Sequence, residues 1–139
     1  MSSNICIIPA RGGSKRIPKK NIKLFNNKPI ISYSIDVAKK SGLFNEIMVS
    51  TDNLEIANIS KSLGASVPFM RSSKNSDDFA TTVEVVKEVI KKYEEKGSFF
   101  DNICCLYPTA PLVQKKDLIN AQKVLEDLVN INPNLKDEL

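Results

Sequence analysis

The sequence has 139 residues, of which 42% are hydrophobic and 26% are charged, and its formal net charge is +4. This composition suits one globular domain over residues 1–139, with a single core. The chain has no histidine, which excludes zinc–histidine sites and every histidine-based catalytic triad.

Apolar runs and helical patterns alternate along the chain, which predicts an α/β fold with a mainly parallel sheet. Residues 4–10 form a continuously apolar run, typical of a central strand that is buried on both faces. A helix is predicted over residues 29–40, and Gly42 lies where a left-handed C-terminal cap is needed. Residues 46–51 then predict a second strand and residues 53–63 a second helix.

The second half of the chain continues the alternation. Residues 67–70 predict a short extended segment and residues 71–79 a polar loop. A helix is predicted over residues 81–95, another buried strand over residues 102–107, and an amphipathic helix over residues 115–129.

The three cysteines lie in apolar runs without C-x-x-C spacing, and they are expected to be buried small hydrophobes. They are Cys6, Cys104 and Cys105. The sequence shows no signal peptide and no long apolar segment, so a cytoplasmic protein without a membrane partner is expected.

Positive charge is concentrated near the N-terminus, because seven Lys or Arg residues and no acidic residue precede Asp36. This distribution indicates an anionic partner, either small or polymeric. Most of the charge surrounds Gly12 and Gly13, which directly follow the first predicted strand. The cations nearest to them are Arg11, Lys15, Arg16, Lys19 and Lys20.

The glycine loop has the properties of a phosphate-binding loop. Gly12 and Gly13 let the main chain approach a ligand and offer bare N–H donors, while the cations neutralise phosphate charge. An ordinary turn with solvated lysines is the alternative, but Ile17 and Pro18 interrupt the charges and favour a structured loop. The loop matches neither the Walker motif nor G-x-G-x-x-G, so the ATPase and dehydrogenase hypotheses lose their main support.

Six motifs carry a resemblance to a known family. They read ARGGSKRIPKKN, KPIISYSI, VSTDN, VPFMR, SDDFATT and CCLYPTAPL, and they span about residue 5 to about residue 125. In this order and spacing they resemble the cytidylyltransferases that activate nonulosonic acids, which are the CMP-sialic acid synthetases and the pseudaminic acid cytidylyltransferases. The segments ATTVEV and CCLY look more like the pseudaminic acid branch, since sialic acid enzymes usually carry glutamine where this chain has Tyr107.

The resemblance implies a Rossmann-like, three-layer α/β/α fold of the nucleotide-diphospho-sugar transferase type. It also implies transfer of CMP from CTP to an acidic nine-carbon sugar, pseudaminic or sialic acid, with release of pyrophosphate. Mg²⁺ is the implied cofactor, a homodimer the implied full-length assembly, and cell-surface polysaccharide synthesis the implied role. No side chain in the sequence is an obvious general base, and none is assigned.

The resemblance also implies the residues of the site. The nucleotide-binding positions are Ala10, Arg11, Gly12, Gly13, Ser14, Lys15, Lys20, Asn21, Arg71, Ala80 and Thr82. Arg11, Lys15 and Lys20 among them are the implied catalytic cations, which stabilise the leaving pyrophosphate. Asp52 and Tyr107 are the implied sugar-binding positions.

Several of these side chains have a second, purely structural interpretation. Asn21 could be a simple loop cap, and Thr82 could cap the helix instead of contacting the base. Asp52 could position a metal or the sugar, or cap the helix that begins at residue 53. For Asp77 and Asp78, helix capping is the expected role.

Family members continue beyond the region that this chain resembles, and carry there an aspartate-x-aspartate motif that binds magnesium. The chain is therefore expected to be C-terminally truncated, with metal ligands that are unknown and strand edges that are exposed. A catalytically inactive, CTP-binding fragment is the first alternative function. The second is a nucleic-acid binder that uses residues 11–28, although this segment offers few aromatic side chains for stacking bases.

Overall fold

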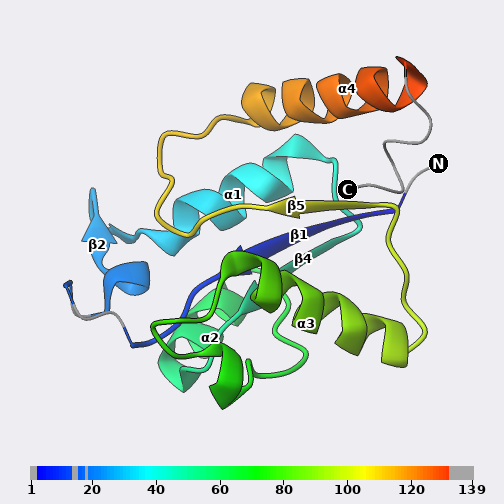
Figure 1. The fold of residues 1–139 in the computed structure, drawn as a ribbon. Coiled ribbons are helices and arrows are strands. Elements are labelled where there is room, and N and C mark those ends of the chain that lie inside the picture. Colours follow the sequence, from blue (N-terminus) through cyan, green and yellow to red (C-terminus); the bar gives the residue numbers. More distant parts are fainter. Residues whose placement is uncertain (1–2, 14–15, 18, 132–139) are drawn as a thin grey trace.

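The computed structural model describes residues 3–13, 16–17 and 19–131. Its main sheet contains three parallel strands in the order β4, β1, β5. β1 spans Asn4–Pro9, β4 spans Glu46–Ser50 and β5 spans Asn102–Cys105. Helices α1 and α4 lie on one side of this sheet and α3 lies on the other (Figure 1). The expected three-layer α/β/α fold with a parallel sheet is confirmed.

The four α-helices of the described residues lie close to their predicted positions. They are α1 (Ile31–Ser41), α2 (Leu54–Ser62), α3 (Thr82–Glu95) and α4 (Lys115–Ile131). As expected, Gly42 caps the C-terminus of α1, and its φ of 68° is left-handed and therefore suits glycine. α3 begins with a capping box, in which Thr81 and Glu84 bond each other's main-chain N–H groups.

β1 lies at the centre of the core because its side chains are buried on both faces of the sheet. Cys6 and Ile8 pack with residues of α1, α2 and α4. Ile5 and Ile7 face the other way and pack with residues of α3. The prediction of a strand that is buried on both faces, made from the continuous apolar run, is therefore confirmed.

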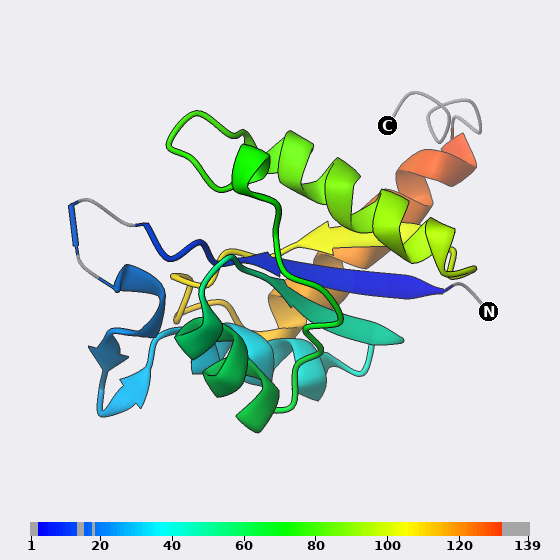
Figure 2. The same ribbon diagram turned by 90° about the horizontal axis from the view of Figure 1, so that it is seen from below.

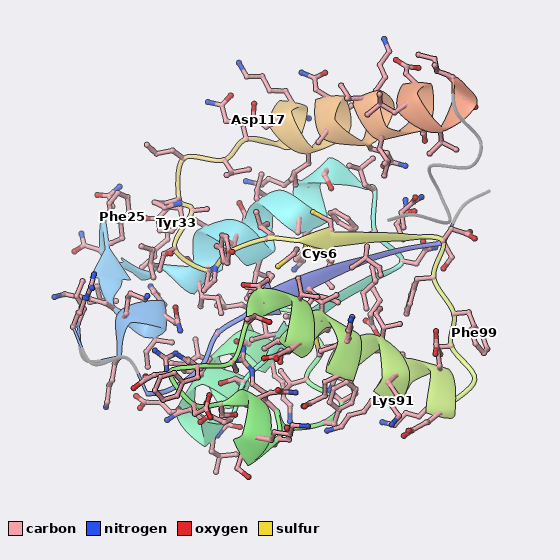
Figure 3. All side chains as sticks on the ribbon, in the orientation of Figure 1. Cys6, Phe25, Tyr33, Lys91, Phe99 and Asp117 are labelled. Carbon is pink, nitrogen blue, oxygen red and sulfur yellow. The ribbon has the colours of Figure 1, made fainter. Side chains whose placement is uncertain are left out.

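The structure also contains a hairpin that the sequence patterns did not predict. Strands β2 (Leu24–Phe25) and β3 (Lys28–Pro29) pair antiparallel, and the two residues between them, Asn26 and Asn27, have positive φ angles. Asparagine tolerates this conformation better than most residues, so the Asn-Asn pair was the available signal. The hairpin packs on α1, where the rings of Phe25 and Tyr33 are 5.6 Å apart (Figure 3).

The short extended segment expected over residues 67–70 is not part of a strand, and a single bridge between Met48 and Ser66 precedes it. One prediction about strands was wrong. β5 is not fully buried, since Ile103 is 45% exposed and Cys105 is exposed as well. The cause is that β5 pairs with β1 on one side only, so it is an edge strand within the described sheet.

The three strands of the main sheet run in the same direction, so their carboxyl ends meet at one edge of that sheet. The loops that follow β1, β4 and β5 gather there, on the left of Figure 2, away from the labelled termini. This edge is where parallel α/β sheets usually bind their ligands. None of the described helices is long and apolar enough to cross a membrane.

Candidate functional site

A pocket of about 190 Å³ lies at the carboxyl ends of β1 and β5. Seven of the predicted site residues line it, namely Arg11, Lys20, Asn21, Arg71, Ala80, Thr82 and Tyr107. They come from four separate segments of the chain, which the fold brings together. The lining is completed by Pro9, Thr81, Val85, Pro108 and Thr109, which the sequence analysis did not identify.

Four predicted residues are not part of this lining, and two more cannot be placed. Ala10, Gly12, Gly13 and Asp52 lie outside the lining. Ala10 is fully buried, and its N–H donates to the main-chain oxygen of Ser50 at 2.8 Å. Ser14 and Lys15 lie outside the described residues. In the described part of the glycine loop, Arg11 lines the pocket, whereas Ala10, Gly12 and Gly13 do not.

Gly12 is required for close packing in this structure. A Cβ atom at Gly12 would lie 2.8 Å from the Cβ atom of Asn53, too close for two carbon atoms. The N–H of Gly12 donates to an oxygen of Asp52 at 2.8 Å. This N–H is thus already bonded, contrary to the expectation of two bare donors. Gly13 has open space around it and remains exposed.

Asp52 connects the loop after β4 to the glycine loop instead of capping α2. The cap of α2 is Asn53, whose side chain accepts the N–H of Ile56 at 3.0 Å. The capping interpretation of Asp52 is therefore wrong. Its bond to Gly12 fixes the start of the glycine loop against the second strand of the sheet.

Arg11, which lines the pocket, forms an ion pair with Asp78, which lies outside the lining. Its Nη1 atom lies 2.6 Å from an oxygen of Asp78, and both side chains are about one-third exposed (33% each). Asn21 is 4% exposed and donates from Nδ2 to the main-chain oxygen of Arg11 at 2.9 Å. Asn21 thus holds the main chain of the glycine loop from a buried position, ten residues along the chain from Arg11.

Arg71 places a buried positive charge at the pocket. It is only 8% exposed, and it donates to the main-chain oxygen of Ser50 at 2.8 Å and to the Ser50 hydroxyl at 3.1 Å. Burial lowers the pKa of Arg71, while the nearby carboxylates of Asp52 and Glu88 oppose this effect. An arginine still stays protonated under these conditions, so the charge is permanent and fixed in position.

Glu88 holds the loop that leads from Arg71 to α3. Its carboxylate accepts the N–H and the hydroxyl of Ser72, at 2.9 and 2.6 Å, and also the side-chain amide of Asn75. Burial alone would raise the pKa of Glu88, but these hydrogen bonds and the nearby Lys92 hold it below its ordinary value. Nothing in the local sequence distinguishes Glu88 from other helical glutamates, so it could not be identified beforehand.

The expected capping roles of Asp77 and Asp78 were wrong. Asp77 accepts the main-chain N–H groups of Phe79 and Ala80, which makes a turn within the loop. Asp78 pairs with Arg11, and the cap of α3 is Thr81. The two acidic residues therefore stabilise the loop before α3, Asp77 through a turn within it and Asp78 through its bond to Arg11.

Thr82 is the first residue of α3 and its hydroxyl serves no cap. Its Oγ1 atom lies 3.3 Å from the hydroxyl of Tyr107, which also lines the pocket. The main-chain oxygen of Tyr107 accepts a bond from the fully buried Ser34 hydroxyl at 2.7 Å. Ser34 thereby fixes the end of β5 on α1, a role that sequence reasoning missed.

Three cations and no carboxylate are among the described residues that line this pocket, so it is suited to an anionic ligand. The cations are Arg11, Lys20 and Arg71. Hydroxyl and amide groups of Asn21, Thr82 and Tyr107 add neutral hydrogen-bonding positions. A small, polar and multiply charged molecule fits this chemistry better than an apolar one.

Comparison with known proteins agrees with this geometry. The model of the family described as cytidylyltransferase matches residues 5–134. A pseudaminic acid cytidylyltransferase of Campylobacter jejuni is 49% identical over 118 residues, which are 85% of this chain and 51% of that protein. A CMP-N,N'-diacetyllegionaminic acid synthase of Legionella pneumophila is 37% identical over 86% of this chain and 52% of its own length.

A solved structure shares the fold. A CMP:2-keto-3-deoxy-manno-octonic acid synthetase, solved in complex with CTP, superposes with a TM-score of 0.74 at 23% identity. The match covers 95% of this chain and 49% of that one. The chain thus spans about half the length of the relatives that it matches. Because the family model covers nearly all of it, the chain belongs to the cytidylyltransferase family.

Proposed function

We propose that this chain binds CTP and takes part in the transfer of CMP to an acidic nine-carbon sugar, with release of pyrophosphate. The observation that carries the proposal is the pocket in which Arg11, Lys20 and Arg71 meet at the carboxyl ends of the strands. Pseudaminic acid is the favoured sugar, because a relative of that name shares 49% identity with the chain. Sialic acid is the second choice.

In the proposed reaction an oxygen of the sugar attacks the α-phosphorus of CTP, and the bond to the β-phosphate oxygen breaks. The attacking hydroxyl loses its proton to solvent, since no general base is assigned. Arg11, Lys15 and Lys20 stabilise the negative charge that accumulates on pyrophosphate. Such catalysis depends on position and electrostatics, both of which the fixed cations of the pocket can supply.

The remaining roles follow the same arrangement. The triphosphate lies along residues 10–15 and the cytosine against Ala80 and Thr82, while Asn21 and Arg71 hold the nucleotide between them. Tyr107 and Asp52 are the proposed sugar contacts, although Asp52 also holds Gly12. A homodimer and a cytoplasmic role in supplying sugars for cell-surface polysaccharides complete the proposal.

Magnesium is the proposed cofactor, but the described residues do not by themselves form a site for it. Among them no three Asp, Glu, Cys or His side chains are placed to hold a metal ion. The carboxylates of Asp52 and Asp78, which lie beside the glycine loop, already bond the N–H of Gly12 and the side chain of Arg11. No step of the reaction is therefore assigned to a metal bound by these residues.

A CTP-binding fragment without catalysis remains the second candidate function, and an assay of pyrophosphate release distinguishes it from the first. A nucleic-acid partner is less suited to the structure, because Phe25 is the only aromatic residue between residues 11 and 28 and its ring packs against Tyr33. Binding of an oligonucleotide that CTP does not displace would favour that partner instead.

Calorimetric titration of the chain with CTP and Mg²⁺ tests the proposal. We expect Lys20→Gln to weaken CTP binding about tenfold, because a charge-assisted contact contributes about 1.5 kcal/mol. Lys19→Gln is the matched control, since the neighbouring Lys19 pairs with Glu55 and does not line the pocket. Equal affinities of the two variants, or no binding by the unaltered chain, would contradict the proposal.

A pyrophosphate-release assay then separates the two candidate functions. The chain is incubated with CTP, Mg²⁺ and pseudaminic acid, and release is followed over time. Release that depends on the sugar supports catalysis by this chain. Calorimetric binding of CTP without any release supports the fragment.

A further inference from the structure

A second pocket lies near the amino end of β5, away from the cationic pocket of Arg11, Lys20 and Arg71. Its volume is about 150 Å³. Asn102, the first residue of β5, lines this second pocket, whereas Tyr107, beyond the last residue of the strand, lines the cationic one. Among the described residues none lines both pockets, so the second pocket is a separate site.

The walls of the second pocket are mainly apolar, since seven of its ten described lining residues are hydrophobic. The largest of them are Leu43 and Phe44 from the loop after α1, and Leu118 and Leu125 from α4. Cys104 of β5 lies beside them. Leu118 belongs to the core between β1, α1 and α4, and Leu43, Phe44 and Cys104 pack against it. The second pocket is therefore continuous with the hydrophobic core, and it is called the apolar pocket below.

The polar side chains that line the apolar pocket already form hydrogen bonds within the protein. The side-chain amide of Asn4 donates to the main-chain oxygen of Leu43 at 2.9 Å, and its oxygen accepts the side-chain amide of Asn102 at 2.8 Å. The side-chain amide of Gln122 donates to Glu126 at 3.2 Å. These groups offer few free partners to a ligand, and burying a polar group without a partner costs free energy. The lining therefore favours an uncharged, apolar ligand.

The helix that covers the apolar pocket is loosely packed. α4 has 17 described residues, of which only Leu118 is buried. Leu125 lines the pocket but is only half-buried. A segment with few buried apolar contacts opens locally at low cost in free energy. A molecule between α4 and β5 adds van der Waals contacts to α4 and so opposes this opening.

We propose that the apolar pocket binds a small, uncharged, apolar molecule of about the size of a benzene ring, and that this molecule holds α4 against the sheet. The volume of about 150 Å³ sets the size of the ligand, because an engineered apolar cavity of that volume in another protein binds benzene and xenon. The bonded polar groups of the lining set its polarity. Since the two pockets share no described residue, the proposal does not depend on the binding of CTP.

Alkylation of Cys104 by iodoacetamide, with and without saturating benzene, tests the proposal on the unaltered chain. Cys104 lines the apolar pocket, and a hydrogen bond from the Cys6 thiol lowers the pKa of Cys104, which favours the reactive thiolate. The neighbouring Cys105 is exposed and lies outside this lining, so it is the internal control. Benzene should slow the alkylation of Cys104 about fivefold or more and leave that of Cys105 unchanged, as measured by tandem mass spectrometry.

A pair of leucine substitutions on α4 tests where the benzene binds. Ala121→Leu should fill the apolar pocket, because Ala121 lines it. Asn120→Leu is the matched control, since it places the same side chain at the preceding position, which is exposed and outside the lining. Benzene should slow amide hydrogen exchange in α4 of the unaltered chain and of Asn120→Leu, but not in α4 of Ala121→Leu.

Several results would overturn the proposal. Equal alkylation rates of Cys104 with and without benzene would show that the pocket does not take an apolar ligand. Equal slowing at Cys104 and Cys105 would show that benzene associates with the protein unspecifically. Slower exchange in Ala121→Leu, to the same extent as in the unaltered chain, would place the benzene elsewhere. If Ala121→Leu does not fold, the two cysteines of the unaltered chain decide the question alone.

Discussion

Replacing Asp78 with asparagine tests whether the acidic loop competes with bound phosphate for Arg11. In the structure Nη1 of Arg11, a residue of the pocket lining, lies 2.6 Å from an Asp78 oxygen. A nucleotide phosphate that binds Arg11 through Nη1 competes with this carboxylate. The asparagine side chain keeps the size and one oxygen acceptor but removes the negative charge.

The size of the effect follows from the exposure of the pair. Both side chains are 33% exposed, so solvent screens the pair and its energy falls within about 0.2–1 kcal/mol. Loss of this competing interaction should therefore tighten CTP binding by up to about fivefold. The gain should shrink at high salt, because exposed ion pairs are screened.

Calorimetric titration at low and high salt measures this change. Asp36→Asn is the matched control, because Asp36 pairs with Lys40 on α1 and its loss changes the net charge equally. Binding by Asp78→Asn that is no tighter than binding by Asp36→Asn would refute the competition. Weaker binding would instead mean that Asp78 organises the site for its ligand.

Three further substitutions test the framework of the site. Gly12→Ala should lower stability by about 1–3 kcal/mol in thermal unfolding, because its Cβ would collide with Asn53, whereas Gly13→Ala has open space. Ser34→Ala should cost about 1–3 kcal/mol in urea unfolding, since it leaves a main-chain oxygen after β5 without its donor. The lowered pKa of Glu88 means that its ionised form stabilises the fold above the ordinary value of 4.5, and that this contribution disappears as the pH falls through the lowered pKa. Glu88→Gln should therefore be less stable at neutral pH and should lose less stability on acidification, as measured by urea unfolding across pH.

Each of these expectations has a contrary outcome. Equal melting temperatures for the two glycine variants would mean that the glycine loop shifts freely. Unchanged stability of Ser34→Ala would mean that water replaces the hydroxyl. Parallel pH profiles for Glu88→Gln and the unaltered chain would show that the carboxylate does not anchor the loop.

Much of the fold could be predicted because its signals are local. The apolar run of β1, the helical periodicities and the cap at Gly42 each depend on residues within a few positions of one another. The hairpin of β2 and β3 was missed because strands of two residues show no periodicity. The extent to which β5 is buried was misjudged, since burial depends on whether a neighbouring strand exists.

The sequence by itself determined the order of the α-helices and of the strands of the main sheet, because each is encoded by residues that are close together in the chain. It also determined the family, through motifs spread along most of the chain. Only the tertiary structure decided which donors and charges are free to bind a ligand. Asp52 occupies the N–H of Gly12, Asp78 pairs with Arg11, and Ser50 holds the buried Arg71. These partners lie between 21 and 67 positions apart, so folding alone brings them within hydrogen-bonding distance.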